Sequence, residues 1–442
     1  MIRRIAIVAG IIAIITAVYL FRVAGRGAMD FAGGITVPLA EYRGTSPTGV
    51  PSALAHAGLV ARGEYLARAA DCSACHTVKG GQPFAGGFAF RLPYGTLYSP
   101  NITPDAETGI GKWSDADFLR AVHEGISPGG SRYYPAFPYP SYSYLADADV
   151  LAIKAYLFSL PPAHAPRVPD TFRFPYNQRW TMKFWSALFR PGGRFEPHED
   201  MSPAWNRGAY LVEGLAHCGD CHTPRSLLQG LDQRRKFAGA VITGWHAYNI
   251  TADKESGIGA WSDDELARYL STGHAAGRGT ASGPMSEAVE LSFSHLARDD
   301  IDAIVTYVRS VPAIANEASP PKQGAPAPAS HLAGVPDGID PLGKYIFEGA
   351  CASCHGWTGE SPVTPQASLV GTRAVNDPSG INVVQIILSG EEHGGSAHLA
   401  HMPSFGRSYS DTEIAAVANY VIARFGGRSS SLTAGDVARL RQ

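Results

Sequence analysis

Three stretches of this chain repeat one pattern: Cys72-Ser73-Ala74-Cys75-His76, Cys218-Gly219-Asp220-Cys221-His222 and Cys351-Ala352-Ser353-Cys354-His355. The chain has six cysteines, and these pentads use all of them, so none is left for a disulfide. In a Cys-x-x-Cys-His pentad the two thiols form thioethers with a porphyrin, and the histidine supplies an axial iron ligand. A zinc site would combine ligands from paired motifs, and a redox-active thiol pair would not recur three times with an adjacent histidine. The pattern predicts three covalently bound haem c groups.

The bulk composition agrees with this prediction. A length of 442 residues suggests about three domains of ~150 residues each. The net charge of −2 gives no basic excess that would indicate binding to nucleic acid. The 49 glycines and 32 prolines suit long loops wrapped around a flat cofactor. The composition therefore favours three small cofactor-binding domains.

The N-terminus resembles an export segment. Arg3 and Arg4 precede an apolar run from Ile5 to Phe21, which as a helix would be about 26 Å long. This run lies at the lower limit for spanning a bilayer and is longer than the core of a cleaved signal. We expect residues 1–25 to be an uncleaved membrane anchor, with a cleaved signal as the alternative. Because covalent haem c is attached outside the cytoplasm, we expect the folded part on the periplasmic side of the inner membrane.

The first two pentads lie in copies of one unit. Asn101-Ile102-Thr103 recurs 148 residues later as Asn249-Ile250-Thr251, and Gly109-Ile110-Gly111 recurs as Gly257-Ile258-Gly259 at the same spacing. We place the two copies at residues 55–165 and 204–315. Each copy is expected to close with an amphipathic helix that has an acidic first turn and stops at a proline, over residues 147–160 and 299–311.

A third, shorter unit is expected at residues 339–427. It lacks the Asn-Ile-Thr block, but Gly343-Lys344-Tyr345 leads into its pentad, as Gly63-Glu64-Tyr65 and Gly208-Ala209-Tyr210 lead into theirs. We expect each glycine to allow close packing of the leading helix on the closing helix, which in this unit spans about 411–425. The remaining segments are interpreted as a linker at 166–203, a Pro/Ala-rich tether at 316–338 and a polar tail at 428–442.

Two methionines are candidates for the second axial position. Met285 follows Gly283-Pro284, Met402 lies in His401-Met402-Pro403, and each comes after its pentad and before its closing helix. A thioether ligand is common in electron-transfer haems and raises their potential. We expect Met285 and Met402 to complete the second and third iron sites.

The first unit departs from this pattern. The position equivalent to Met285 is Phe137, which cannot ligate iron. The first haem is therefore predicted to be five-coordinate or bound by a substitute. His123 is the nearest candidate, although the favoured interpretation of this residue is a surface loop position, and Tyr133, Tyr134 and Met182 are weaker candidates.

The linker between the first two units is rich in aromatic and basic residues. Residues 172–202 include Trp180, Phe184 and Trp185 beside Arg179 and Lys183. Such a segment could contact a membrane surface or a partner, or could pack between the units.

Together with the pentads and the export segment, three stretches carry a resemblance: "YPAFPYPSY" (134–142), "WNRGAYLVEGLAHCGDCHTPR" (205–225) and "HMPSF" (401–405). The chain resembles the triple-haem cytochrome c subunits of membrane-bound alcohol, gluconate, sorbitol, fructose and molybdenum-dependent aldehyde or nicotinate-type dehydrogenases. The resemblance covers about residues 55–430. Phe137 departs from the family's usual Tyr-Pro-Ala-Met-Pro-Tyr. The resemblance implies an all-α fold of three tandem cytochrome c-type domains behind an N-terminal membrane-anchor helix.

The resemblance also implies a function. Such a chain is an electron-transfer subunit, and no catalytic residues are assigned to it. It accepts electrons from a catalytic partner that holds pyrroloquinoline quinone, flavin or a molybdenum cofactor, sometimes with a small third subunit, and passes them to ubiquinone. The alternative is a peroxidase-like haem enzyme with an open first iron site, for which His123 and Glu124 are the candidate acid–base residues.

The expected haem contacts fall into two sets. The iron ligands are His76, His222, His355, Met285 and Met402. The thioethers form at Cys72, Cys75, Cys218, Cys221, Cys351 and Cys354.

Overall fold

The structure is a computed structural model that describes residues 10–19, 46–190, 192–316, 338–392 and 401–441. Most of the expected anchor (1–25) and of the tether (316–338) therefore lies outside the described residues. Residues 10–19 are helical, with exposed apolar side chains. Among the residues described, no helix has both the length and the apolar character needed to cross a membrane.

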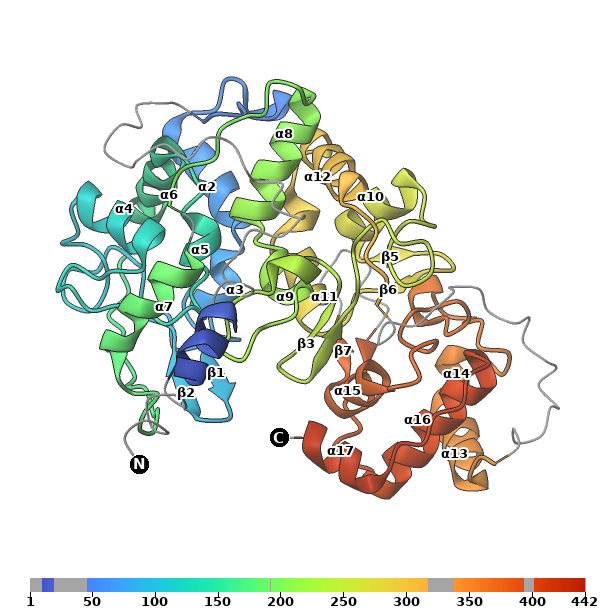
Figure 1. The fold of residues 1–442 in the computed structure, drawn as a ribbon. Coiled ribbons are helices and arrows are strands. Elements are labelled where there is room, and N and C mark those ends of the chain that lie inside the picture. Colours follow the sequence, from blue (N-terminus) through green and yellow to red (C-terminus); the bar gives the residue numbers. More distant parts are fainter. Residues whose placement is uncertain (1–9, 20–45, 191, 317–337, 393–400, 442) are drawn as a thin grey trace.

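We keep the boundaries expected from the sequence and, for reference, call residues 55–165, 204–315 and 339–427 domains 1, 2 and 3. In Figure 1, domain 2 lies between domain 1 and domain 3. The described part is mostly helical, as expected, with four short two-stranded antiparallel sheets that the all-α interpretation did not include. These hairpins are short paired segments within the loops, and the core is formed mainly by the helices.

Domain 1 and its preceding turn contain η1 (Ser52–Leu54), α2 (Leu59–Ala69), α3 (Cys72–His76), β1 (Ala89–Leu92), β2 (Gly95–Tyr98), α4 (Asp115–Glu124), α5 (Tyr139–Tyr142) and α6 (Asp147–Ser159). The linker adds η2 (Arg179–Thr181) and α7 (Met182–Phe189).

Domain 2 repeats this order with additions: α8 (Pro203–Ala209), the π-helical turn η3 (Tyr210–Leu215), α9 (Gly219–His222), η4 (Gln233–Arg235), β3 (Ala240–Ile242), β4 (Trp245–Ala247), α10 (Asp263–Thr272), β5 (His274–Ala275), β6 (Gly279–Thr280), α11 (Pro284–Leu291), η5 (Phe293–His295) and α12 (Arg298–Ser310).

Domain 3 contains α13 (Pro341–Ile346), the π-helical turn η6 (Phe347–Cys351), α14 (Ala352–His355), η7 (Pro365–Ala367), α15 (Ile381–Ser389), β7 (Glu391–Glu392), β8 (His401–Met402) and α16 (Asp411–Phe425). The segment expected to be a polar tail forms α17 (Ala434–Leu440), which packs on α16 and buries Val437 completely.

In each domain a glycine lets the leading helix cross the closing helix. A Cβ atom on Gly63 would lie 1.9 Å from Ala152 O, and one on Gly208 would lie 2.0 Å from Ala303 O. In domain 3 the same contact joins Gly343 to Ala416 O, at 2.2 Å. Real Cβ atoms do not approach other atoms this closely, so the expected role of these glycines is confirmed.

Domains 1 and 2 share one continuous hydrophobic core, whereas domain 3 has its own. Two reciprocal hydrogen bonds join domain 1 to domain 2 at this shared core. Tyr65 of domain 1 donates to Asp300 of domain 2 at 2.6 Å, and Tyr210 of domain 2 donates to Asp149 of domain 1 at 2.7 Å. Each aspartate also pairs with an arginine of its own domain, Arg207 for Asp300 and Arg62 for Asp149. The two domains therefore meet through a pseudo-two-fold interface.

Domain 3 packs on domain 2 through α15 and β4. The side chain of Asn382 bonds both backbone groups of His246, accepting from N at 2.8 Å and donating to O at 3.0 Å. Asp377 accepts a hydrogen bond from His246 Nδ1 at 2.8 Å and one from Tyr248 at 3.3 Å. Both His246 and Asp377 are buried, so this boundary is a close-packed interface.

The linker at 166–203 folds onto both domains. Ser186 on α7 is buried and lies 2.9 Å from the Tyr139 hydroxyl of domain 1. Trp185 Nε1 donates to Leu228 O of domain 2 at 2.8 Å. Trp180 and Phe184, in contrast, are 65% and 62% exposed. The linker therefore packs between the domains on one side and leaves aromatic rings uncovered on the other.

Candidate haem-attachment sites

Each pentad occupies a short helical turn. Its cysteines belong to α3, to α9 and its N-cap, and to η6 and α14. Burial raises the pKa of Cys72 and Cys218 to about 12, and that of Cys351 to about 11. Such thiols are neutral and poor nucleophiles at pH 7. These three thiols therefore lack the lowered pKa that is typical of redox-active cysteines.

The three pentad histidines share one hydrogen-bond geometry. Nδ1 lies 2.8 Å from Pro100 O in His76, 2.6 Å from Tyr248 O in His222 and 2.6 Å from Ala367 O in His355. Since a carbonyl only accepts hydrogen bonds, Nδ1 carries the proton and the lone pair is on Nε2. Burial lowers the pKa of all three rings, that of His222 to about 4, which keeps them neutral. A neutral imidazole held in this way is the form that ligates iron.

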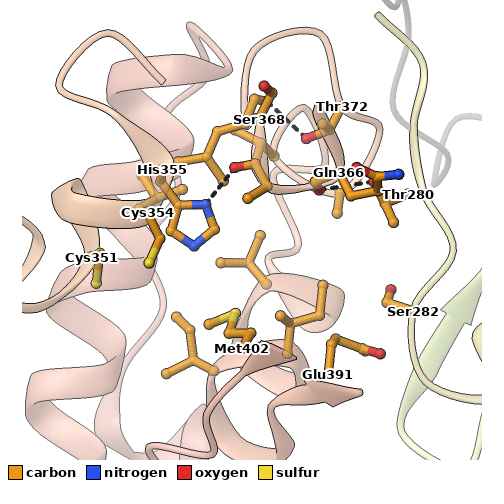
Figure 2. Close-up of a pocket in the computed structure, with 18 of the residues that line it drawn as sticks. Thr280, Ser282, Cys351, Cys354, His355, Gln366, Ser368, Thr372, Glu391 and Met402 are labelled. Atoms are coloured by element: carbon orange, nitrogen blue, oxygen red, sulfur yellow. Dashed lines mark hydrogen bonds between the residues drawn. The ribbon is translucent and has the colours of Figure 1, made fainter. Parts of the chain in front are cut away.

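The third site contains a cavity of about 250 Å³. Cys351, Cys354, His355 and Met402 all line it, and Figure 2 shows the His355 ring and the Met402 side chain entering it from different walls. The rest of the wall is largely apolar. The structure thus brings together every residue predicted for the third site.

Domain 2 contributes to the wall of this third cavity. Thr280, Ala281 and Ser282 line it, and Thr280 donates a 3.0 Å hydrogen bond to Gln366 O. Glu391 also lines the cavity, and burial raises its pKa to about 7. The third site is therefore built at the boundary between two domains.

Met285 lies in the first turn of α11, half-buried against the shared core. Helix α11 packs on α3, which carries the first pentad. Beyond the effect of burial, Glu287 and the Cys221 thiol add to the raised pKa of Cys75, so the first two pentads lie close together. The contacts described for α11 do not include His222, and ligation by Met285 stays a prediction.

Around the first pentad, Phe137 packs against the shared core, with its ring 5.6 Å from that of Tyr142. His123 is not a surface loop residue: it lies on α4 and is completely buried. Its Nδ1 is 2.9 Å from Tyr142 O, and its Nε2 is 3.3 Å from Asp147 Oδ1. Nδ1 faces a carbonyl, and Nε2 makes no hydrogen bond among the described residues, so ligation of iron by His123 stays a prediction.

Two of the weaker ligand candidates make other contacts. Tyr134 donates a hydrogen bond to Tyr176 O at 2.6 Å, and Tyr133 packs edge-on against Phe137. Met182 begins α7, in the linker. A sixth ligand at the first pentad stays a prediction without an assigned residue.

The described residues fit a haem group. The thiol pairs, the oriented imidazoles and the cavity supply its thioethers, proximal ligands and apolar contacts. In addition, Trp261 Nε1 and Arg373 Nε are buried and have no hydrogen-bond acceptor among the described residues. Buried donors of this kind are ordinarily satisfied. The two carboxylates of a haem would provide acceptors.

Three residues near the sites were not found from the sequence: Glu391, Arg373 and Asp377. All belong to domain 3, and all contact domain 2. Domain 3 lacks the repeat that aligns the other two, so no internal comparison singles these residues out. Their spacing from the pentad gave no signal.

Two family profiles match the chain. The profile described as "Cytochrome c" matches residues 60–161, and that described as "Cytochrome C oxidase, cbb3-type, subunit III" matches residues 341–421. These matches cover domain 1 and domain 3. Cytochrome c domains bind haem c covalently, in agreement with the pentads.

Curated relatives extend over most of the chain. It is 40% identical over 422 residues to the fructose dehydrogenase cytochrome subunit of Gluconobacter japonicus, covering 89% of this chain and 85% of that one. It is 39% identical over 408 residues to the gluconate 2-dehydrogenase cytochrome c subunit of Pantoea cypripedii, covering 88% and 90%. It is 41% identical over 394 residues to a nicotinate dehydrogenase subunit of Pseudomonas putida, a match that covers 87% of this chain but only 32% of that longer protein. The chain therefore belongs to the family of cytochrome c subunits of dehydrogenases.

Proposed function

We propose that this chain is the triple-haem electron-transfer subunit of a dehydrogenase complex, relaying electrons from a catalytic partner to ubiquinone. One observation carries the proposal: all three pentad histidines are half-buried, neutral and oriented by a backbone carbonyl through Nδ1. The same arrangement at three places supports three iron sites. A bound haem supplies reversible one-electron storage, and the chain supplies its ligands and burial.

The names of the relatives support a catalytic partner for this chain. The fructose and gluconate enzymes are named with a separate cytochrome subunit. We propose a catalytic dehydrogenase partner for this chain too, with pyrroloquinoline quinone, flavin or a molybdenum cofactor. A small third subunit is compatible with this arrangement. The substrate is decided by the partner.

We propose that the linker face meets the membrane on the periplasmic side. Four exposed side chains support this: Phe174, Tyr176, Trp180 and Phe184 are each at least 52% exposed. The helix at residues 10–19, whose apolar side chains are also exposed, approaches domain 2 close by, since the Leu227 N–H donates to the Tyr19 hydroxyl at 3.1 Å. Exposed aromatic rings next to an apolar helix are typical of a lipid–water interface.

The complex can be tested by mild detergent extraction from native membranes, a native gel stained for haem and mass spectrometry of the haem band. We expect a larger dehydrogenase subunit to migrate with this chain, and the isolated complex to reduce a short-chain ubiquinone when its substrate is added. An intact mass should show three added haem groups. A chain that migrates alone, or that carries two haems, would contradict the proposal.

The membrane contact has its own test. In vesicles containing brominated lipids, Trp180 fluorescence should be quenched, with Trp180→Phe giving the contribution of the other tryptophans. Quenching equal in the two proteins would mean that the linker face lies away from the lipid. Protection of that face only when the catalytic subunit is added would assign it to the partner.

A further inference from the structure

Arg373 is a buried cation that forms no ion pair in the described structure. Its side chain is 7% exposed. The other buried lysine and arginine side chains of the described residues each form an ion pair with a carboxylate: Lys154, Arg194, Arg207 and Lys236. A buried guanidinium without an anion is strongly unfavourable. An anion is therefore expected next to Arg373.

The neighbours of Arg373 do not supply this anion. Nη1 donates to Asn249 O at 3.2 Å, and Nη2 donates to Ser256 O. The guanidinium lies 4.7 Å above the ring of Tyr248. Carbonyls and a ring stabilise the cation but carry no net charge, and Nε has no acceptor among the described residues.

The negative charge of Asp377 acts on Arg373 from a distance, but this carboxylate makes its hydrogen bonds to other residues. Asp377 accepts hydrogen bonds from His246 Nδ1 and from the Tyr248 hydroxyl. No ion pair joins it to Arg373 in the described structure. Burial lowers the pKa of Arg373 to about 10, so the side chain is still charged at neutral pH.

The direction of the side chain assigns Arg373 to the second site. Its chain neighbours Thr372 and Ala374 line the third cavity, whereas Arg373 does not. Its contacts are instead with domain 2, at Asn249 and Ser256. The residue before Asn249 is Tyr248, whose carbonyl orients His222. Besides burial, the positive charge of Arg373 contributes to the lowered pKa of His222.

We propose that Arg373, carried by domain 3, pairs with a propionate carboxylate of the haem attached to domain 2. This rests on the proposed function, in which the second pentad carries a haem. A guanidinium suits the task, because its planar fork matches a carboxylate and it is weakly hydrated. The second haem site is then completed by a residue from the neighbouring domain, and its electrostatics depend on that domain being docked.

The charge makes a prediction for the redox titration of the full chain. With Arg373→Gln, the carboxylate loses its counter-charge and favours the ferric state. The titration should have three components, one for each haem, and the midpoint potential of one of them should fall by at least about 59 mV. For a one-electron couple this corresponds to a tenfold change in the ferrous-to-ferric ratio. Arg373→Lys keeps the positive charge but lacks the planar guanidinium fork. The midpoint potential of the same component should therefore fall, but by less than in Arg373→Gln. The lysine variant also serves as the test if the glutamine variant is not recovered folded.

Two further variants separate this effect from a disturbed interface. Asn382→Ala removes the backbone contacts to His246 at the same boundary without changing charge, and should leave all potentials unchanged. Met402→His changes the ligand at the third iron and so identifies the component of the third haem. In the double variant, the shift due to Arg373→Gln should appear on a different component.

Intact mass distinguishes the failures. Two attached haems, with none on the second pentad, would overturn the proposed function. Three attached haems with unchanged potentials in both Arg373 variants would overturn this inference alone. A shift on the component that Met402→His identifies would move the pairing to the third haem and would also contradict it.

Discussion

Glu391 is bonded to Gly283 across the boundary of domains 3 and 2: the glycine N–H donates to the carboxylate at 2.8 Å. Gly283 lies two residues before Met285, and Glu391 pairs with Met402 in the β7–β8 ladder. Gly283 has φ of 52°, and a Cβ there would lie 2.5 Å from the Trp245 ring, so the turn requires glycine. A single contact thus positions the segments that carry both methionines.

Glu391→Ala should destabilise the domain 2–domain 3 boundary. It removes the acceptor of the Gly283 N–H, and the loss of such a bond costs about 1–3 kcal/mol. Glu391→Gln keeps a carbonyl acceptor and should lose less. Urea unfolding measures the stability, and the absorption band of methionine-ligated ferric haem reports the ligand segments. Equal stability of the alanine and glutamine variants would show that the hydrogen bond is unimportant.

Tyr210→Phe should weaken the pairing of domains 1 and 2 by about 1–3 kcal/mol, because it leaves buried Asp149 and the Ala146 N–H without the hydroxyl. The matched control is Tyr345→Phe, since Tyr345 holds the equivalent place in domain 3 but is 69% exposed. This control should change the unfolding free energy by less than about 0.5 kcal/mol. The prediction fails if both variants unfold at the same urea concentration.

Gly343→Ala should disrupt the helix crossing of domain 3. The added methyl group would lie 2.2 Å from Ala416 O, a backbone atom that can move only with its helix, and overpacking of this kind costs about 1–3 kcal/mol or more. Gly349→Ala, in the π-helical turn of the same domain, meets nothing within 4 Å and is the control. Thermal unfolding should show a lower midpoint for the first variant only. An unchanged midpoint would mean that α13 and α16 can separate at little cost.

Acid should destabilise the α4 region through His123. Burial lowers the pKa of this ring below the 6.5 of an exposed histidine, although Asp147 opposes the shift and Arg194 adds to it. Between these two pKa values the unfolded chain binds more protons, so stability is lost as the pH falls below about 6.5, with a slope of at most about 1.4 kcal/mol per pH unit.

His123→Gln should flatten this pH dependence, and unfolding free energies at pH 7.5 and pH 5 measure it. The control is His164→Gln, since the His164 side chain is 60% exposed and makes only long contacts to acids. Parallel pH curves for wild type and His123→Gln would contradict the prediction.

The parts of the fold that were predictable are those in which chemistry and repetition act together. The pentads required their cysteines and histidines, and the repeated Gly-x-Tyr predicted the glycine crossings of α2, α8 and α13. The capping box at Ser114 and the one at Ser262 likewise follow from the repeat.

What remained hidden depends on contacts between distant segments. Tyr65 and Asp300 are 235 residues apart in the chain, and nothing in local sequence pairs them. A signal existed in the repeat, because Arg62 and Tyr65 recur as Arg207 and Tyr210, while the third copy has Leu342 in place of the arginine. The interpretation of His123 as a loop residue was wrong because an isolated histidine in the sequence gives no indication of its partners Asp147 and Tyr142.

The reciprocal bonds of Tyr65 with Asp300 and of Tyr210 with Asp149 have the form of a homodimer interface, in which each subunit presents the same patch to the other. Domains 1 and 2 are thus organised like two subunits of an ancestral dimer joined into one chain by gene fusion. In a true homodimer every substitution appears twice. After fusion the two halves can change independently. One half has Phe137 at the position where the other has Met285, a difference that two identical subunits could not show.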